Sequence, residues 1–146
     1  MLGELRNAWH FQKETIMKPL HTCVRVKNLD ASLKFYADAL SLTEDRRLDF
    51  PEQEFTIVYL RAEGYEYELE LTYNYGHGAY EIGDGYGHIA LGVEDIEGLH
   101  KAHEEAGYTI TDIKGLPDQK PMFYFLTDPD GYKIEIISLP VFEGRD

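Results

Sequence analysis

The sequence is poor in cysteine, in long apolar runs and in basic residues, and each shortage excludes a class of protein. A single cysteine among 146 residues excludes an intramolecular disulfide framework and is typical of a reducing compartment. No apolar run approaches the roughly 20 residues that a membrane span needs, and the N-terminal segment lacks the apolar stretch of a secretory signal. Fourteen basic and 27 acidic residues give a net charge of −13, which repels nucleic acids and anionic membranes. We therefore expect a soluble, acidic, cytoplasmic protein with no nucleic-acid or membrane partner.

The length fits one domain or two small modules that share a core, and 43% hydrophobic residues is ordinary for a globular chain. Helical spacing after Asp30 and after Asp95 predicts two capped helices, the second ending at Gly107. Residues 1–17 also have apolar residues at helical spacing, which indicates either an amphipathic arm or an ill-ordered terminus. Apolar alternation and β-rich composition predict strands at 20–28, 55–62, 67–74, 88–95, 108–113, 121–128 and 132–139.

Two segments recur along the chain in the same order. HTCVRVKNLDASLKFY begins at residue 21, and HIALGVEDIEGLHKAH, which begins at residue 88, matches it without a gap. YELEL at 67–71 is matched by YKIEI at 132–136. Repetition on this scale indicates a duplicated βαβββ unit and an α+β fold. The predicted organisation is an arm at 1–17, a first module at 18–76, a connector at 77–87, a second module at 88–140 and a tail at 141–146.

Each module offers one histidine in its first strand and one glutamate in its last. The two pairs are His21 with Glu70 and His88 with Glu135. Strand alternation places all four side chains on the face opposite the aliphatic residues. Taken singly, each residue is explained by the solvated face of a sheet. If the four converge, two imidazoles and two carboxylates form a site for a borderline divalent metal such as Zn, Ni, Co or Fe(II).

The motifs HTCVRV…LDASLKFY, LELTYN, GYGHIAL and DPDGYKIEII resemble those of glyoxalase I (lactoylglutathione lyase), of the vicinal-oxygen-chelate superfamily. The resemblance covers about residues 18–139. It implies that His21, Glu70, His88 and Glu135 are the metal ligands, and that the paired modules form a cup-shaped, eight-stranded mixed sheet. It also implies a homodimer, in which both chains commonly supply ligands. The lack of long insertions is similar to the short bacterial type, which prefers Ni or Co over Zn.

The resemblance also implies a reaction. The hemithioacetal of methylglyoxal and a thiol, usually glutathione, is isomerised to an S-2-hydroxyacyl thioester through a metal-bound enediolate. Glu135 is implied as the base, while Glu70 remains a ligand or serves the opposite face. Arg25 and Asn74 stand where the family contacts the γ-glutamyl end of glutathione; without the motifs they would be a surface arginine and a turn asparagine. Cys23 is interpreted as a cavity-wall residue, because its sequence neighbourhood holds no base to activate it.

One segment departs from the family pattern. Bulky Met122, Phe123 and Tyr124 precede DPDG, and PDQKP replaces a glycine-rich or lysine-rich loop, which leaves the thiol carrier open. Other functions of the same fold stay as alternatives. The second glutamate argues against an extradiol dioxygenase, and an acyl-CoA epimerase would need a more basic lining. A metal-free drug-binding module of the bleomycin-resistance type would not need two histidines and two glutamates in repeated register.

Overall fold

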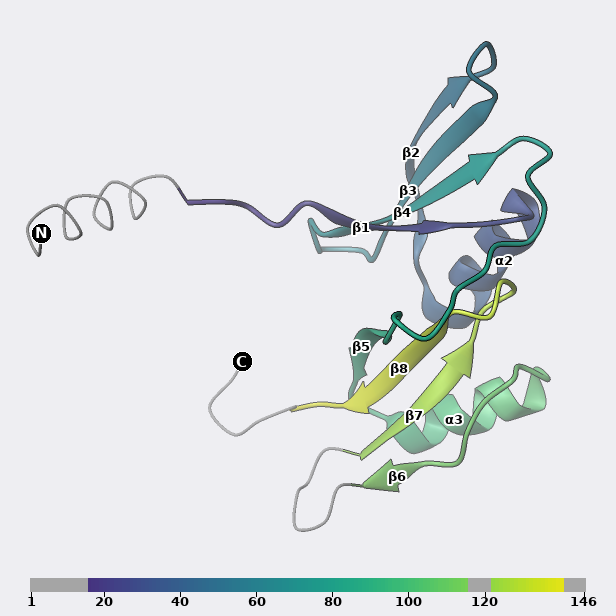
Figure 1. The fold of residues 1–146 in the computed structure, drawn as a ribbon. Coiled ribbons are helices and arrows are strands. Elements are labelled where there is room, and N and C mark those ends of the chain that lie inside the picture. Colours follow the sequence, from purple (N-terminus) through teal and green to yellow (C-terminus); the bar gives the residue numbers. More distant parts are fainter. Residues whose placement is uncertain (1–15, 116–121, 141–146) are drawn as a thin grey trace, which may run out of the picture.

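The computed structural model describes residues 16–115 and 122–140, and in it two similar halves follow one another along the chain (Figure 1). The first half contains β1 (His21–Arg25), α2 (Leu29–Leu40), β2 (Thr43–Phe50), β3 (Phe55–Arg61) and β4 (Glu68–Asn74). The second half contains β5 (Ile89–Val93), α3 (Ile96–Glu105), β6 (Lys114–Gly115), β7 (Met122–Thr127) and β8 (Lys133–Ser138). The predicted arm lies almost wholly outside the described residues, and the predicted tail lies entirely outside them.

Each half forms a four-stranded mixed sheet of the same topology. The strand order is β1-β4-β3-β2 in the first sheet and β5-β8-β7-β6 in the second. In both sheets the first strand runs parallel to the last, and the other neighbours are antiparallel. The α+β class and the duplicated βαβββ unit are therefore confirmed, with the eight strands divided between two sheets of four.

Two strands differ from the prediction. β2 has no predicted counterpart, because TEDRRLDF carries charges on both faces and lacks apolar alternation. It forms by pairing with β3, where the Arg61 guanidinium donates to Asp45 at 2.9 Å. The strand predicted at 108–113 is wrong: only Ile110 makes a bridge, to Leu126, and β6 itself follows that segment.

The two helices begin with side-chain caps. Asn28, and not Asp30, is the N-cap of α2, and its Oδ1 accepts from the Ala31 backbone N–H at 3.0 Å. Asp30 instead lies in the first turn, where its negative charge interacts favourably with the positive N-terminal end of the helix dipole. Asp95 caps α3 as predicted, and Gly107, at φ +82°, follows its end. Neither of these helices, nor any other in the described residues, is long and apolar enough to cross a membrane.

Both halves contribute to one buried core. Alternate residues of the inner strands are almost fully buried, as Val24, Leu71 and Ile136 illustrate, and α2 adds Phe35 and Tyr36. Because successive residues of a strand face opposite sides, this core leaves the other face of each sheet to the candidate site residues.

The turn at 128–131 ties the second half to the first. Its Asp130 Oδ1 accepts from the Lys27 backbone N–H at 2.8 Å, just before α2. The Tyr132 hydroxyl, directly after the turn, donates to the Arg25 carbonyl oxygen at 2.9 Å. Backbone and side-chain contacts at one corner therefore fix the two halves to each other.

Candidate metal centre

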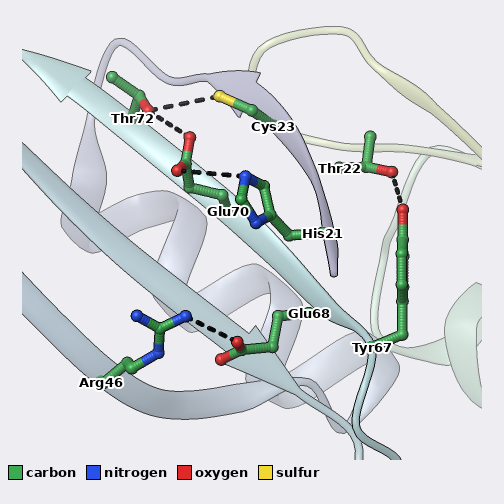
Figure 2. Close-up of polar contacts among 8 residues, drawn as sticks. All are labelled: His21, Thr22, Cys23, Arg46, Tyr67, Glu68, Glu70 and Thr72. Carbon is green, nitrogen blue, oxygen red and sulfur yellow. Dashed lines mark hydrogen bonds and ion pairs between the residues drawn. The ribbon is translucent and has the colours of Figure 1, made fainter. Parts of the chain in front are cut away.

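The first half brings His21 and Glu70 together. His21 is the first residue of β1, and Glu70 lies in β4, the strand parallel to β1. His21 Nε2 lies 3.7 Å from Glu70 Oε1, and Figure 2 shows the imidazole beside the carboxylate. The Glu70 side chain is 11% exposed, whereas that of His21 is 36% exposed. The pair is thus a nearly buried carboxylate with an accessible imidazole beside it.

Hydrogen-bond donors surround the Glu70 carboxylate. The Thr72 hydroxyl donates to Glu70 Oε2 at 2.9 Å, and Cys23 Sγ lies 3.3 Å from Thr72 Oγ1 (Figure 2). Burial would raise the pKa of Glu70, but hydrogen bonds from Cys23, Tyr59 and Thr72 outweigh it and hold this pKa below its usual value. Glu70 is therefore ionised at neutral pH, the form in which a carboxylate ligates a metal.

The second half repeats this arrangement with His88 and Glu135. His88 precedes β5 directly, Glu135 lies in β8, and 3.8 Å separates His88 Nε2 from Glu135 Oε2. Phe125, the register partner of Glu135, packs edge-on against His88 with 5.3 Å between ring centroids. Tyr59 packs on His21 in the same way, at 5.4 Å.

The four predicted ligands form two separate pairs within one chain. Among residues 16–115 and 122–140, no three or more histidine, cysteine, aspartate or glutamate side chains are grouped so that they could hold a metal ion. Each half supplies one imidazole nitrogen and one carboxylate, which leaves most coordination positions of an ion open.

Arg25 and Asn74 lie on the same sheet face as the first pair, at the C-terminal ends of β1 and β4. The Asn74 amide donates to the Tyr80 hydroxyl at 2.9 Å, and the Tyr80 ring stacks on His77 with centroids 3.9 Å apart. This contact leaves Asn74 Oδ1 as an acceptor. His77 and Tyr80 are in the connector, whose aperiodic sequence gives no sign of the contact.

Cys23 faces the first pair without being an activated nucleophile. Burial and a hydrogen bond to Glu70 raise the pKa of the Cys23 thiol, which keeps the thiol protonated at neutral pH. The bulky residues before DPDG divide between two sides of their strand. Tyr124 is fully buried and hydrogen-bonds His103, whereas Phe123 packs edge-on against Phe125. The loop PDQKP lies outside the described residues.

Sequence comparisons connect the chain to known proteins. A family model described as the Glyoxalase/Bleomycin resistance protein/Dioxygenase superfamily matches residues 18–136. The chain is 43% identical over 124 residues to a "Probable lactoylglutathione lyase" from Synechocystis sp., which covers 81% of this chain and 92% of the relative. It is 44% identical over 124 residues to the "Lactoylglutathione lyase" of Haemophilus influenzae, with 83% and 92% covered.

Solved structures agree with the sequence relatives. A trypanothione-dependent glyoxalase I from Leishmania major is 38% identical with a TM-score of 0.74, and the match covers 84% of this chain and 87% of that one. Glyoxalase I from Zea mays is 34% identical with a TM-score of 0.76, over 82% of this chain and 44% of that one. Sequence match and repeated sheet topology agree: this chain belongs to the Glyoxalase/Bleomycin resistance protein/Dioxygenase superfamily.

Proposed function

We propose that this protein is a lactoylglutathione lyase (glyoxalase I), a metal-dependent enzyme that isomerises the hemithioacetal of methylglyoxal and glutathione to an S-2-hydroxyacyl thioester. The observation that carries the proposal is the presence of one His–Glu pair in each half, on equivalent strands. Relatives that carry this enzyme name at 39 to 44% identity support it.

The geometry of each pair fits a divalent metal ion. Bonds of about 2.1 Å from one ion place an imidazole nitrogen and a carboxylate oxygen about 3.0 to 3.4 Å apart. The observed separations of 3.7 and 3.8 Å need only a small side-chain adjustment to reach that range. Nitrogen and oxygen donors together suit Ni, Co or Zn, and of these Ni or Co is our proposal for this chain.

His21, Glu70, His88 and Glu135 are the ligands in this proposal, and a homodimer brings them together. The first pair of one chain would face the second pair of another copy, because within the described part of one chain the pairs stay apart. Exposed apolar side chains are available for such a contact, since Leu20, Tyr67 and Leu139 are between 45% and 61% exposed.

Glu135 is the proposed catalytic base. Held by the four ligands, a metal ion would supply the positive charge that polarises the oxygens of the hemithioacetal and acidifies the neighbouring C–H bond. The Glu135 carboxylate takes that proton and returns it to the adjacent carbon. Its strand neighbours Ala90 and Phe125 have no polar side-chain atom, so neither holds the carboxylate in place. Glu70, anchored by Thr72, keeps its position or acts on the opposite face.

Arg25 and Asn74 are the proposed contacts for the γ-glutamyl end of glutathione. A guanidinium pairs with the carboxylate of that group, and the free Asn74 oxygen accepts from its ammonium. The cytoplasm, where glutathione keeps thiols reduced, is the proposed compartment, in keeping with a single cysteine. The boundaries of the two modules and of the connector are proposed as predicted from the repeat.

The test is an assay of metal-loaded protein. The apoprotein is loaded with Ni, Co or Zn, mixed with methylglyoxal and glutathione, and thioester formation is followed by ultraviolet absorbance. We expect metal-dependent thioester formation that is fastest with Ni or Co. Trypanothione, the thiol named for the Leishmania relative, serves as the comparison thiol. Bound metal without thioester from either thiol would indicate another substrate, and failure to bind metal would favour a metal-free binding module.

A further inference from the structure

Tyr59 and Phe125 occupy equivalent places beside the two ligand pairs. Tyr59 is the register partner of Glu70, and Phe125 is that of Glu135. Each ring also packs edge-on against the histidine of its own pair, with interplanar angles of 71° and 72°. The chemical difference between the two rings is the Tyr59 hydroxyl, a hydrogen-bond donor carried on the same sheet face as the Glu70 carboxylate.

Arg46 covers the Tyr59 ring. It is the register partner of Tyr59 in β2, and its Cζ lies 3.8 Å from the ring centroid, within the range of a cation–π contact. Its guanidinium also donates to Glu68 Oε1 at 2.9 Å, as Figure 2 shows. A planar guanidinium held by a carboxylate and stacked on a ring restricts the ring's movement. Tyr59 is therefore held in place on the side of Arg46.

The burial of the Glu68 carboxylate is not explained by a gain in folding stability. Its side chain is only 13% exposed, and its Oε2 has no hydrogen-bond partner among the described residues. A buried carboxylate oxygen without a partner is destabilising, and an ion pair with the half-exposed Arg46 contributes little to stability. The equivalent residue of the second half is Lys133, which donates to Thr127. Glu68 is thus the acceptor for the guanidinium that covers the Tyr59 ring.

The remaining neighbours of Glu70 show the same contrast between halves. Thr72 donates to Glu70, whereas the matching place in β8 holds Ile137. The register partner of Glu70 in β1 is Cys23, and the matching residue in β5 is Ala90. Three polar neighbours in the first half are thus replaced by apolar ones in the second.

We propose that Tyr59 is a positioning residue, held by Arg46 and Glu68, which fixes Glu70 as a permanent metal ligand and leaves Glu135 as the mobile one. The inference rests on the proposed function, and it adds a physical reason why the equivalent glutamates Glu70 and Glu135 have different roles. Donors around a ligating carboxylate fix its orientation and raise metal affinity. A carboxylate among apolar side chains has no such anchor and is free to move a proton.

The experiment exchanges the hydroxyl between the two halves. Y59F removes it beside Glu70, and F125Y introduces it beside Glu135. Three measurements are made on each full-length protein: the Kd for Ni²⁺ by competition with a chromophoric chelator, the visible spectrum of the Co²⁺-loaded form, and the steady-state kinetics (kcat and KM) with the hemithioacetal. Thermal unfolding of the metal-free proteins separates these effects from loss of the fold.

We expect Y59F to raise the Kd for Ni²⁺ about ten-fold and to change the Co²⁺ spectrum. F125Y should leave that Kd at or below the wild-type value and lower kcat about ten-fold, because Glu135 gains an anchor. R46K, which keeps the charge but loses the planar group, should weaken Ni²⁺ binding less than Y59F does. E68Q keeps an acceptor for Arg46 but loses the ion pair, so it should weaken Ni²⁺ binding no more than R46K does.

Unchanged Ni²⁺ affinity and Co²⁺ spectrum in folded Y59F would overturn the positioning role, as would equal effects of Y59F and F125Y. If Y59F does not fold, R46K decides the question, and an unchanged Kd for Ni²⁺ with an unchanged Co²⁺ spectrum there would overturn the positioning role. Absence of lyase activity in the wild-type protein would instead contradict the proposed function, while the metal affinities and spectra would still decide the role of Tyr59.

Discussion

The Tyr36 hydroxyl in α2 donates to Asp128 Oδ2 at 2.6 Å, and this buried hydrogen bond joins the two halves. Y36F removes the donor and leaves a buried carboxylate oxygen without its partner, so we expect a loss of about 1.5 to 3 kcal/mol in the free energy of unfolding. Urea denaturation measures the loss. Y65F, at a side chain that is 71% exposed, is the control and should change the free energy by less than about 0.5 kcal/mol.

Asp128 should also make stability depend on pH. Burial raises the pKa of Asp128 above its usual value, despite hydrogen bonds from Tyr36 and two backbone N–H groups. An acid with a raised folded-state pKa contributes stability below its unfolded pKa and loses that contribution as pH rises through the folded pKa. Relative to D128N, the wild-type protein should therefore lose stability as pH rises above about 4, the usual pKa of an aspartate. Urea denaturation of both proteins over a series of pH values tests this prediction. A wild-type stability that rises relative to that of D128N as the pH increases would contradict it.

Most of the fold could be predicted from the periodicity of the apolar residues and from the two sequence segments that are repeated. Apolar alternation marks β1, β4, β5 and β8, because one face of each lies on the core. β2 carries charges on both faces, and β6 has two residues, so neither contains a local pattern. Both strands form because a neighbouring strand pairs with them, and their own residues do not indicate that pairing.

The candidate site could be predicted only in part, for a similar reason. Strand parity puts His21 and Glu70 on one face, and the parallel pairing of β1 with β4 then brings them within 3.7 Å. The place of Tyr59 depends on the register of β3 against β4, which alternation alone does not fix. The separation of the two pairs depends on how one sheet lies against the other, and no local pattern encodes that.

The two glutamates should respond differently to the same substitution. E135Q removes the proposed base, so we expect turnover to fall about 10²- to 10⁴-fold while the Kd for Ni²⁺ changes little. E70Q replaces the anchored ligand, so its main effect should be on the Kd, which we expect to rise at least about ten-fold. Chelator competition and the thioester assay separate the two effects. Near-normal turnover of metal-loaded E135Q would exclude Glu135 as the base.

Mixing two inactive variants tests whether the site is shared between chains. H21A/E70A destroys the first pair, and H88A/E135A destroys the second. In a mixed dimer with shared sites, one site has all four ligands and the other has none, so refolding an equal mixture should restore about a quarter of wild-type activity. Each variant refolded alone is the control. No recovery in a mixture that sedimentation shows to contain dimers would place each site within one chain.

Metal binding should stabilise the folded protein. Only the folded chain holds each histidine beside its glutamate, so at a free Ni²⁺ concentration 100 times the Kd we expect about 2.7 kcal/mol of stabilisation, or about 8 °C in Tm. Chelation should reverse the shift together with the activity. H21A/H88A should abolish the shift, because each pair then loses its imidazole, whereas H77A, in the exposed connector, should keep it. A shift that survives in H21A/H88A would mean that Ni²⁺ binds elsewhere on the protein, and the ligand assignment would fail.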